Sequence, residues 1–64
     1  MQLNGKTITT APALTLAQLL KQRGFDGSRV AVELNGSIVS RNDFGKVQLQ
    51  DSDTLEVVQF VGGG

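Results

Sequence analysis

Residues 14–25, LTLAQLLKQRGF, carry the signals for one short amphipathic helix, whose apolar face the rest of the chain must cover. Thr15 is a suitable N-cap, and Gln18 three positions later completes a capping box. Gly24 stands where helices commonly end in the left-handed conformation. Three apolar side chains at helical spacing form one stripe on this helix: Leu16, Leu19 and Leu20. A single amphipathic helix needs another layer to cover its stripe, so the other segments must supply that layer.

The composition leaves apolar packing to stabilise the fold. The chain has 64 residues, 39% of them hydrophobic, and contains neither cysteine nor histidine. Disulfides and the usual zinc sites are excluded, so we expect no bound metal and no bound cofactor. The common nucleophile–base pairs of enzymes also require His or Cys. We therefore predict one small domain that has no catalytic residues and is not itself an enzyme.

Charge and hydropathy exclude further classes of function. Six basic and six acidic side chains cancel to a formal net charge of zero. Nucleic-acid binding depends on a basic surface and is not expected. No apolar run approaches the ~20 residues that cross a bilayer, and the start of the chain lacks the features of a signal peptide. We expect a cytoplasmic protein that binds neither nucleic acid nor membrane.

Two Asn–Gly pairs predict tight turns between strands. The first, Asn4-Gly5, fits a type I′ hairpin turn in which both central residues have positive φ. The second, Asn35-Gly36, follows a segment that alternates apolar and polar residues over residues 30–34. The apolar positions that we expect to face the helix from these segments are Leu3, Ile8, Val30, Val32 and Leu34.

The second half of the chain contains two further predicted strands. KVQLQ, residues 46–50, places Val47 and Leu49 on one face of a short strand, and TLEVVQFV begins the last strand at Thr54. Residues 40–44 are interpreted as a loop or one short helical turn. The acidic run at residues 51–53 is interpreted as a solvated turn, in preference to a metal or acid/base site.

These elements predict an α+β fold in which one mixed sheet of four to five strands packs on one main helix. If the last strand returns to the centre of the sheet beside the first, the two run parallel. We expect this domain to span residues 1–60, with a flexible glycine tail over residues 61–64.

The last strand has two faces with different roles. Leu55 and Val57 are expected to point at the helix, which leaves Val58 and Phe60 on the opposite face. One helix covers one face only, so Val58 and Phe60 are predicted to form an exposed apolar patch on which partners dock. In the alternative interpretation the strand twists near its end and Phe60 is partly buried.

The chain ends in FVGGG, where an apolar strand runs directly into three glycines. Extended, residues 61–64 reach roughly 13 Å beyond the domain. Because glycine has no Cβ, Gly62 and Gly63 fit a channel that is too narrow for other residues. The carboxylate of Gly64 is the one group that a second enzyme could activate. The alternative is an idle chain end.

The whole pattern resembles the ubiquitin-like β-grasp sulfur carriers, and within them the ThiS family of the thiamine pathway. The similarity rests on LNGK near the start, VELNG in the middle strand, and the ending FVGGG. It implies that a ThiF-type enzyme adenylates the carboxylate of Gly64 with ATP and that sulfur then replaces the adenylate. It also implies that the resulting thiocarboxylate supplies sulfur to a ThiG-type thiazole synthase, while Gly62 and Gly63 thread into the partner active sites.

Three other functions stay open on the sequence. The small subunit of molybdopterin synthase has the same fold and a similar ending, although those proteins are generally longer. An activated glycine end can also be passed to an amine, as in protein conjugation. A non-covalent interaction module would leave the tail inert, and only this last function predicts indifference to terminal truncation.

Overall fold

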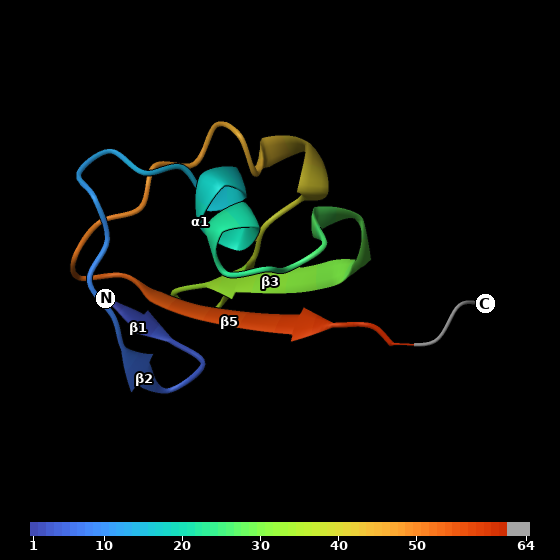
Figure 1. The fold of residues 1–64 in the computed structure, drawn as a ribbon, viewed down its shortest axis with the longest axis horizontal. Helices are drawn as coiled ribbons and strands as arrows, with labels where there is room; N and C mark the ends of the chain where they lie inside the picture. The colour runs from blue at the N-terminus through green and yellow to red at the C-terminus, as the bar shows by residue number, and fades with distance from the viewer. Residues whose placement is uncertain (62–64) are drawn as a thin grey trace.

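The structure is a computed structural model that describes residues 1–61. It contains a five-stranded sheet, one α-helix and two single 3-10 turns (Figure 1). The bounds are β1 Gln2–Leu3, β2 Lys6–Thr7, α1 Leu16–Gln22, η1 Gly27–Arg29, β3 Val30–Leu34, β4 Ser37–Ile38, η2 Arg41–Asp43 and β5 Thr54–Gln59. None of the helices among these residues is long and apolar enough to span a membrane.

The last strand, β5, lies at the centre of the sheet. The strand order is β2-β1-β5-β3-β4, with β5 parallel to β1 and antiparallel to β3. The hairpins β1–β2 and β3–β4 therefore flank it on either side. The last strand does return to the centre of the sheet beside the first, which is the condition for a parallel pair. The predicted α+β class and mixed sheet are confirmed.

The helix begins and ends where its capping residues predict. The Thr15 main-chain N–H donates to Gln18 Oε1 at 2.9 Å, and the Gln18 N–H donates to Thr15 Oγ1 at 3.2 Å. This reciprocal pair satisfies two of the donors that a helix start leaves free. After the last turn, Gly24 has a φ of +79°, which glycine adopts without strain.

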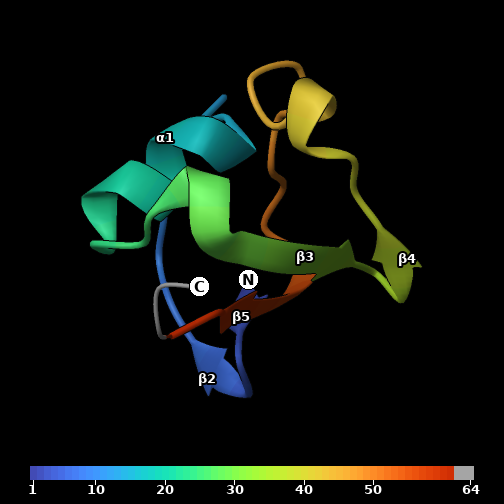
Figure 2. The ribbon, with the colours of Figure 1, turned by 90° about the vertical axis from the view of Figure 1, so that its right-hand side faces the viewer.

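The core lies between α1 and one face of the sheet. Leu16, Leu19 and Leu20 are almost fully buried, as are Val32 and Leu55 on the strands beneath them. Figure 2 shows α1 and η2 on the same side of β3 and β5. The segment around η2 adds Phe44, which is 6% exposed and which the sequence pattern did not place in the core. The complete buried set is Met1, Leu3, Leu14, Leu16, Leu19, Leu20, Val30, Val32, Phe44, Leu49, Leu55 and Val57.

Both predicted Asn–Gly turns are present, and their asparagines have a second role. Asn4 and Asn35 have φ values of 49° and 52°, as the type I′ turn requires. The Asn4 side chain accepts from the Val57 N–H at 2.7 Å and donates to the Val57 carbonyl at 3.1 Å. The Asn35 side chain accepts from the Thr54 N–H at 2.9 Å. Each turn is thereby tied to β5.

The predicted strand at residues 46–50 is wrong. Its only ladder contact is an isolated bridge between Gln48 and Thr15. The Leu16 N–H donates to the Val47 carbonyl, and the Leu49 N–H donates to the Leu14 carbonyl, each within 2.9 Å. The segment therefore pairs with the entry to α1 and not with the sheet. Alternation still directs Leu49 into the core, which is why the pattern resembles a strand.

The prediction of a solvated turn at residues 51–53 is wrong for Asp53, which is 9% exposed. Its carboxylate accepts from the Asn35 side-chain amide at 3.0 Å and from the Gln50 N–H at 2.8 Å. These two hydrogen bonds offset the cost of burying a charge. The carboxylate thereby links the turn before β5 to the β3–β4 hairpin.

We predict that Asp53→Ala lowers the free energy of unfolding by about 1–3 kcal/mol, because the Asn35 side-chain amide and the Gln50 N–H lose a partly buried acceptor. Urea denaturation followed by circular dichroism measures the change. Asp51→Ala removes the same charge from an exposed neighbour and should change stability by less than about 0.5 kcal/mol. Equal effects of the two substitutions would contradict the structural role of Asp53.

We also predict that Asn4→Gly lowers the free energy of unfolding by about 1–3 kcal/mol, although glycine suits the positive φ of this turn. The loss comes from the two hydrogen bonds to Val57. Asn42→Gly is the matched control, because Asn42 is exposed and its φ is not positive. An Asn4→Gly protein as stable as the Asn42→Gly protein would show that the side-chain bonds contribute nothing.

Candidate functional site

The candidate site is the end of β5, where the chain leaves the domain. Val58 is 61% exposed, Phe60 is 55% exposed and Val61 is 90% exposed. Leu55 and Val57 of the same strand are buried, so the alternation predicted for the strand is confirmed. At 55% exposure Phe60 lies on the surface but is partly covered, which fits both the exposed patch and the alternative of partial burial.

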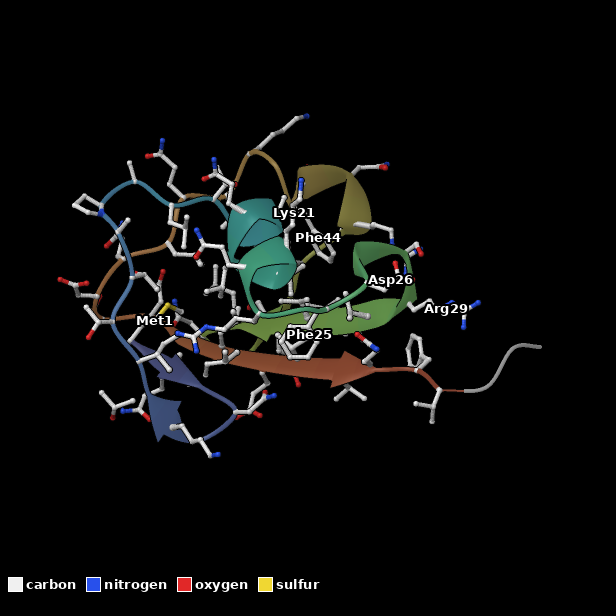
Figure 3. The ribbon with its side chains drawn as sticks, in the orientation of Figure 1. Met1, Lys21, Phe25, Asp26, Arg29 and Phe44 are labelled. Atoms are coloured by element: carbon white, nitrogen blue, oxygen red, sulfur yellow. The ribbon has the colours of Figure 1, made fainter. Side chains whose placement is uncertain are left out.

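A short loop secures this end of the strand. The Phe60 N–H donates to the Arg29 carbonyl at 2.7 Å. One residue earlier, the Gln59 side chain accepts from the Asp26 main-chain N–H at 3.0 Å. Figure 3 shows Asp26 and Arg29 on the loop beside the end of β5. The position from which the tail departs is therefore set by β3 and by the loop that precedes it.

The loop owes its own shape to Asp26. The Asp26 carboxylate accepts from the Ser28 hydroxyl at 2.6 Å and from the Ser28 N–H at 2.9 Å. These hydrogen bonds, with a smaller contribution from the positive charges of Arg29 and Arg41, lower the pKa of Asp26. They favour the ionised carboxylate because both donate to its oxygens.

Arg41 attaches the same loop to the second half of the chain. Its Nε donates to the Gly27 carbonyl at 3.1 Å, and its Nη2 lies 3.5 Å from the Val30 carbonyl. Because Arg41 belongs to η2, the end of β5 is connected to the loop at residues 26–29 and, through that loop, to β3 and η2. Sequence reasoning missed this arrangement, since no local signal reports which loop lies beside the end of β5.

The sheet face opposite α1 combines apolar and acidic side chains. Val58 lies directly across from Ala31, and Glu56 lies directly across from Glu33. Ile38, at 80% exposure, pairs with Glu33 on the other side. Two like charges directly opposite each other are unfavourable. The single ion pair found among residues 1–61 joins Arg29 to Asp26, so neither glutamate is neutralised by a described side chain.

The site is a surface and an exit point, not a cavity. Residues 1–61 form no pocket, and they bring together no group of three or more acidic side chains that could hold a metal ion. Of the predicted site residues, Val58 and Phe60 lie on the same face at one end of the sheet. Gly62, Gly63 and Gly64 lie outside the described residues.

Comparisons with known proteins connect this architecture to one family. The ThiS family model matches residues 1–64. The sulfur carrier protein ThiS of Bacillus subtilis is 37% identical over 65 residues, covering the whole chain and 98% of that protein. The crystal structure of the thiamine biosynthesis protein ThiS from Geobacter metallireducens superimposes with a TM-score of 0.79 at 33% identity, covering 98% of this chain and 96% of that one.

Longer relatives contain the same region as one part. A thiazole synthase from Magnetococcus marinus is 45% identical over 64 residues, and the match spans all of this chain. That match is only 20% of the synthase, so the chain spans about a fifth of the length of such relatives. The match of the family model over the full chain, together with the agreement in fold, establishes that this protein belongs to the ThiS family.

Proposed function

We propose that this protein is a sulfur carrier of thiamine biosynthesis and that the carboxylate of Gly64 is its reactive group. The protein catalyses nothing in this scheme and is a substrate for partner enzymes in the cytoplasm. The observation that carries the proposal is the position of β5, which lies at the centre of the sheet and ends beside a secured loop, three residues before the glycines begin.

The chemistry requires activation because a carboxylate is a poor acyl donor. In the proposed first step, a carboxylate oxygen of Gly64 attacks the α-phosphorus of ATP and pyrophosphate leaves, which forms an acyl adenylate. A hydrosulfide equivalent then adds to the carbonyl carbon. The bond between this carbon and the phosphate oxygen breaks, AMP leaves with the electron pair of that bond, and one proton is released. The product is a thiocarboxylate. ATP binds to the activating enzyme, of ThiF type, and not to the carrier.

Two observations support the choice of partners. The full-length similarity to a protein named sulfur carrier ThiS supports the thiamine pathway over the molybdopterin pathway. The similarity of this chain to one part of thiazole synthases supports a ThiG-type enzyme as the acceptor of the sulfur. A carrier must fit both enzymes in turn, so its docking surface needs to be near the reactive end. The exposure of Val58 and Phe60 near the end of β5 supports them as that surface.

We predict that removing Gly62, Gly63 and Gly64 together abolishes thiocarboxylate formation, since the carboxylate then lies about 10 Å short of its position in the full chain. Intact mass spectrometry after incubation with ATP, sulfide and a ThiF-type enzyme measures the exchange of one oxygen for sulfur. The fold should survive, because the core described for residues 1–61 ends at Val57.

Two further variants separate the length of the tail from its width. Deleting one glycine leaves a chain that still ends in Gly-Gly, shortened by about 3.5 Å. Gly64→Ala keeps the length and adds one Cβ, and we expect the rate of sulfur transfer to fall by about 100-fold. Thiocarboxylate formation by the protein that lacks all three glycines would refute the proposed function.

We predict that Val58→Asp and Phe60→Asp weaken binding to the ThiF-type enzyme by tenfold or more, because they place a charge in a desolvated apolar contact. Ile38→Asp is the matched control, since Ile38 is exposed and lies on the same sheet far from the end of β5. Isothermal titration calorimetry measures the affinities, and circular dichroism checks the fold. Equal weakening by all three substitutions would contradict a patch localised at the end of β5.

A further inference from the structure

The main-chain hydrogen bonds of β5 alternate between its two neighbours. Toward β1, the Asp53 carbonyl accepts from the Gln2 N–H at 3.0 Å and the Leu55 carbonyl accepts from the Asn4 N–H at 2.9 Å. Toward β3, the Thr54 carbonyl accepts from the Asn35 N–H at 2.8 Å. Odd-numbered residues of β5 therefore present their main-chain groups to the β1 side, and even-numbered residues present theirs to β3.

The β1 side runs out of partners before β5 ends. β1 stops at Leu3, and the chain then turns away through Gly5 into β2. The next odd-numbered residue, Val57, is satisfied by the side chain of Asn4, which accepts from its N–H and donates to its carbonyl. Figure 1 shows β5 continuing well past the end of β1. The Asn4 side chain is thus the last group on this edge.

Beyond Val57, the edge of β5 is open. The N–H and carbonyl of Gln59 point to the vacant β1 side, and no hydrogen bond from another described residue reaches them. Val61 follows two residues later along the same direction and is 90% exposed. The opposite edge differs, since the Phe60 N–H is held by Arg29. An edge with free donors and acceptors at alternate residues is the template on which another strand pairs.

We propose that the activating enzyme adds an extended strand to this open edge, pairing with the main chain of Gln59 and Val61 in the position that β1 vacates. The inference rests on the proposed function and names how the enzyme recognises the carrier. A strand paired here holds the last described residues extended and aims Gly62, Gly63 and Gly64 along the strand direction. Recognition through main-chain groups requires no particular side chain, so it is compatible with a tail made of glycine.

The enzyme is a better occupant than a second copy of this chain. A second copy offers the same open edge, limited to Gln59 and Val61 because Asn4 closes it at Val57. Two such edges pair over only two or three residues, fewer than a usual strand. The neighbouring apolar side chains of Val58 and Phe60 extend the contact surface next to the edge, and a larger partner can cover both at once.

Amide hydrogen exchange followed by NMR tests the pairing residue by residue. In the free protein, we expect the Gln59 and Val61 amides to exchange rapidly and the Phe60 amide to exchange slowly, because Phe60 donates to Arg29. Addition of the ThiF-type enzyme with ATP should slow exchange at Gln59 and Val61. Unchanged exchange at both amides in a saturated complex would overturn the proposal. So would slow exchange in the free protein that depends on its concentration, which would indicate self-pairing.

Val61→Pro gives a second test, because proline removes the free N–H but suits an extended chain. Val61→Ala is the matched control, since it removes the same side chain and keeps the N–H. We expect Val61→Pro to bind the enzyme roughly three- to tenfold more weakly than Val61→Ala, as the loss of one hydrogen bond predicts. Equal affinities would overturn the strand pairing.

The two proposals fail in different ways. If the wild-type protein gains no sulfur with any ThiF-type enzyme, the proposed function fails. If it gains sulfur while Val61→Pro and Val61→Ala bind equally and the Gln59 amide still exchanges rapidly in the complex, only the strand pairing fails.

Discussion

The pairing of β5 on both sides is the constraint on which the rest of this structure depends. This strand joins the β1–β2 hairpin to the β3–β4 hairpin, because it pairs parallel to β1 and antiparallel to β3. The two hairpins are also attached to it by side chains, through Asn4 at Val57 and Asn35 at Thr54. Long-range pairings cost loop entropy, and these side-chain hydrogen bonds, which span 53 and 19 residues, add to the contacts that hold the central strand.

The same strand connects stability to function. Its inward residues, Leu55 and Val57, are part of the core, while Val58 and Phe60 stay exposed on the other face. Its end is fixed by Arg29 and Asp26, yet its outer edge beyond Val57 has no partner among the described residues. A strand whose end is fixed and whose edge is open is well suited to present a chain end to an enzyme. Little conformational entropy is lost on binding, because the end of the strand is already oriented.

Local signals predicted those parts of the fold in which neighbours in sequence satisfy one another. Thr15 and Gln18 cap the helix from three positions apart, and Asn4-Gly5 determines its turn through positive φ alone. The prediction failed where the partner is distant. Asp53 is buried because Asn35 reaches it, and alternation in residues 46–50 cannot show that their hydrogen bonds go to the entry of α1. Alternating apolar residues describe a face, not a hydrogen-bonding neighbour.

The sequence by itself determined the helix with its leucine stripe, the two Asn–Gly turns, the alternation of faces along the last strand, and the absence of any cysteine or histidine chemistry. These follow from periodicity and from residue type, which act over a few positions. Only the tertiary structure decided that the Arg29 carbonyl accepts from the end of β5 and that Glu33 lies opposite Glu56. It also decided that Asn4 is the last hydrogen-bond partner on the β1 side of β5, before the unpaired main chain of Gln59. Those features depend on strand order and register, which are set by contacts between residues far apart in the chain.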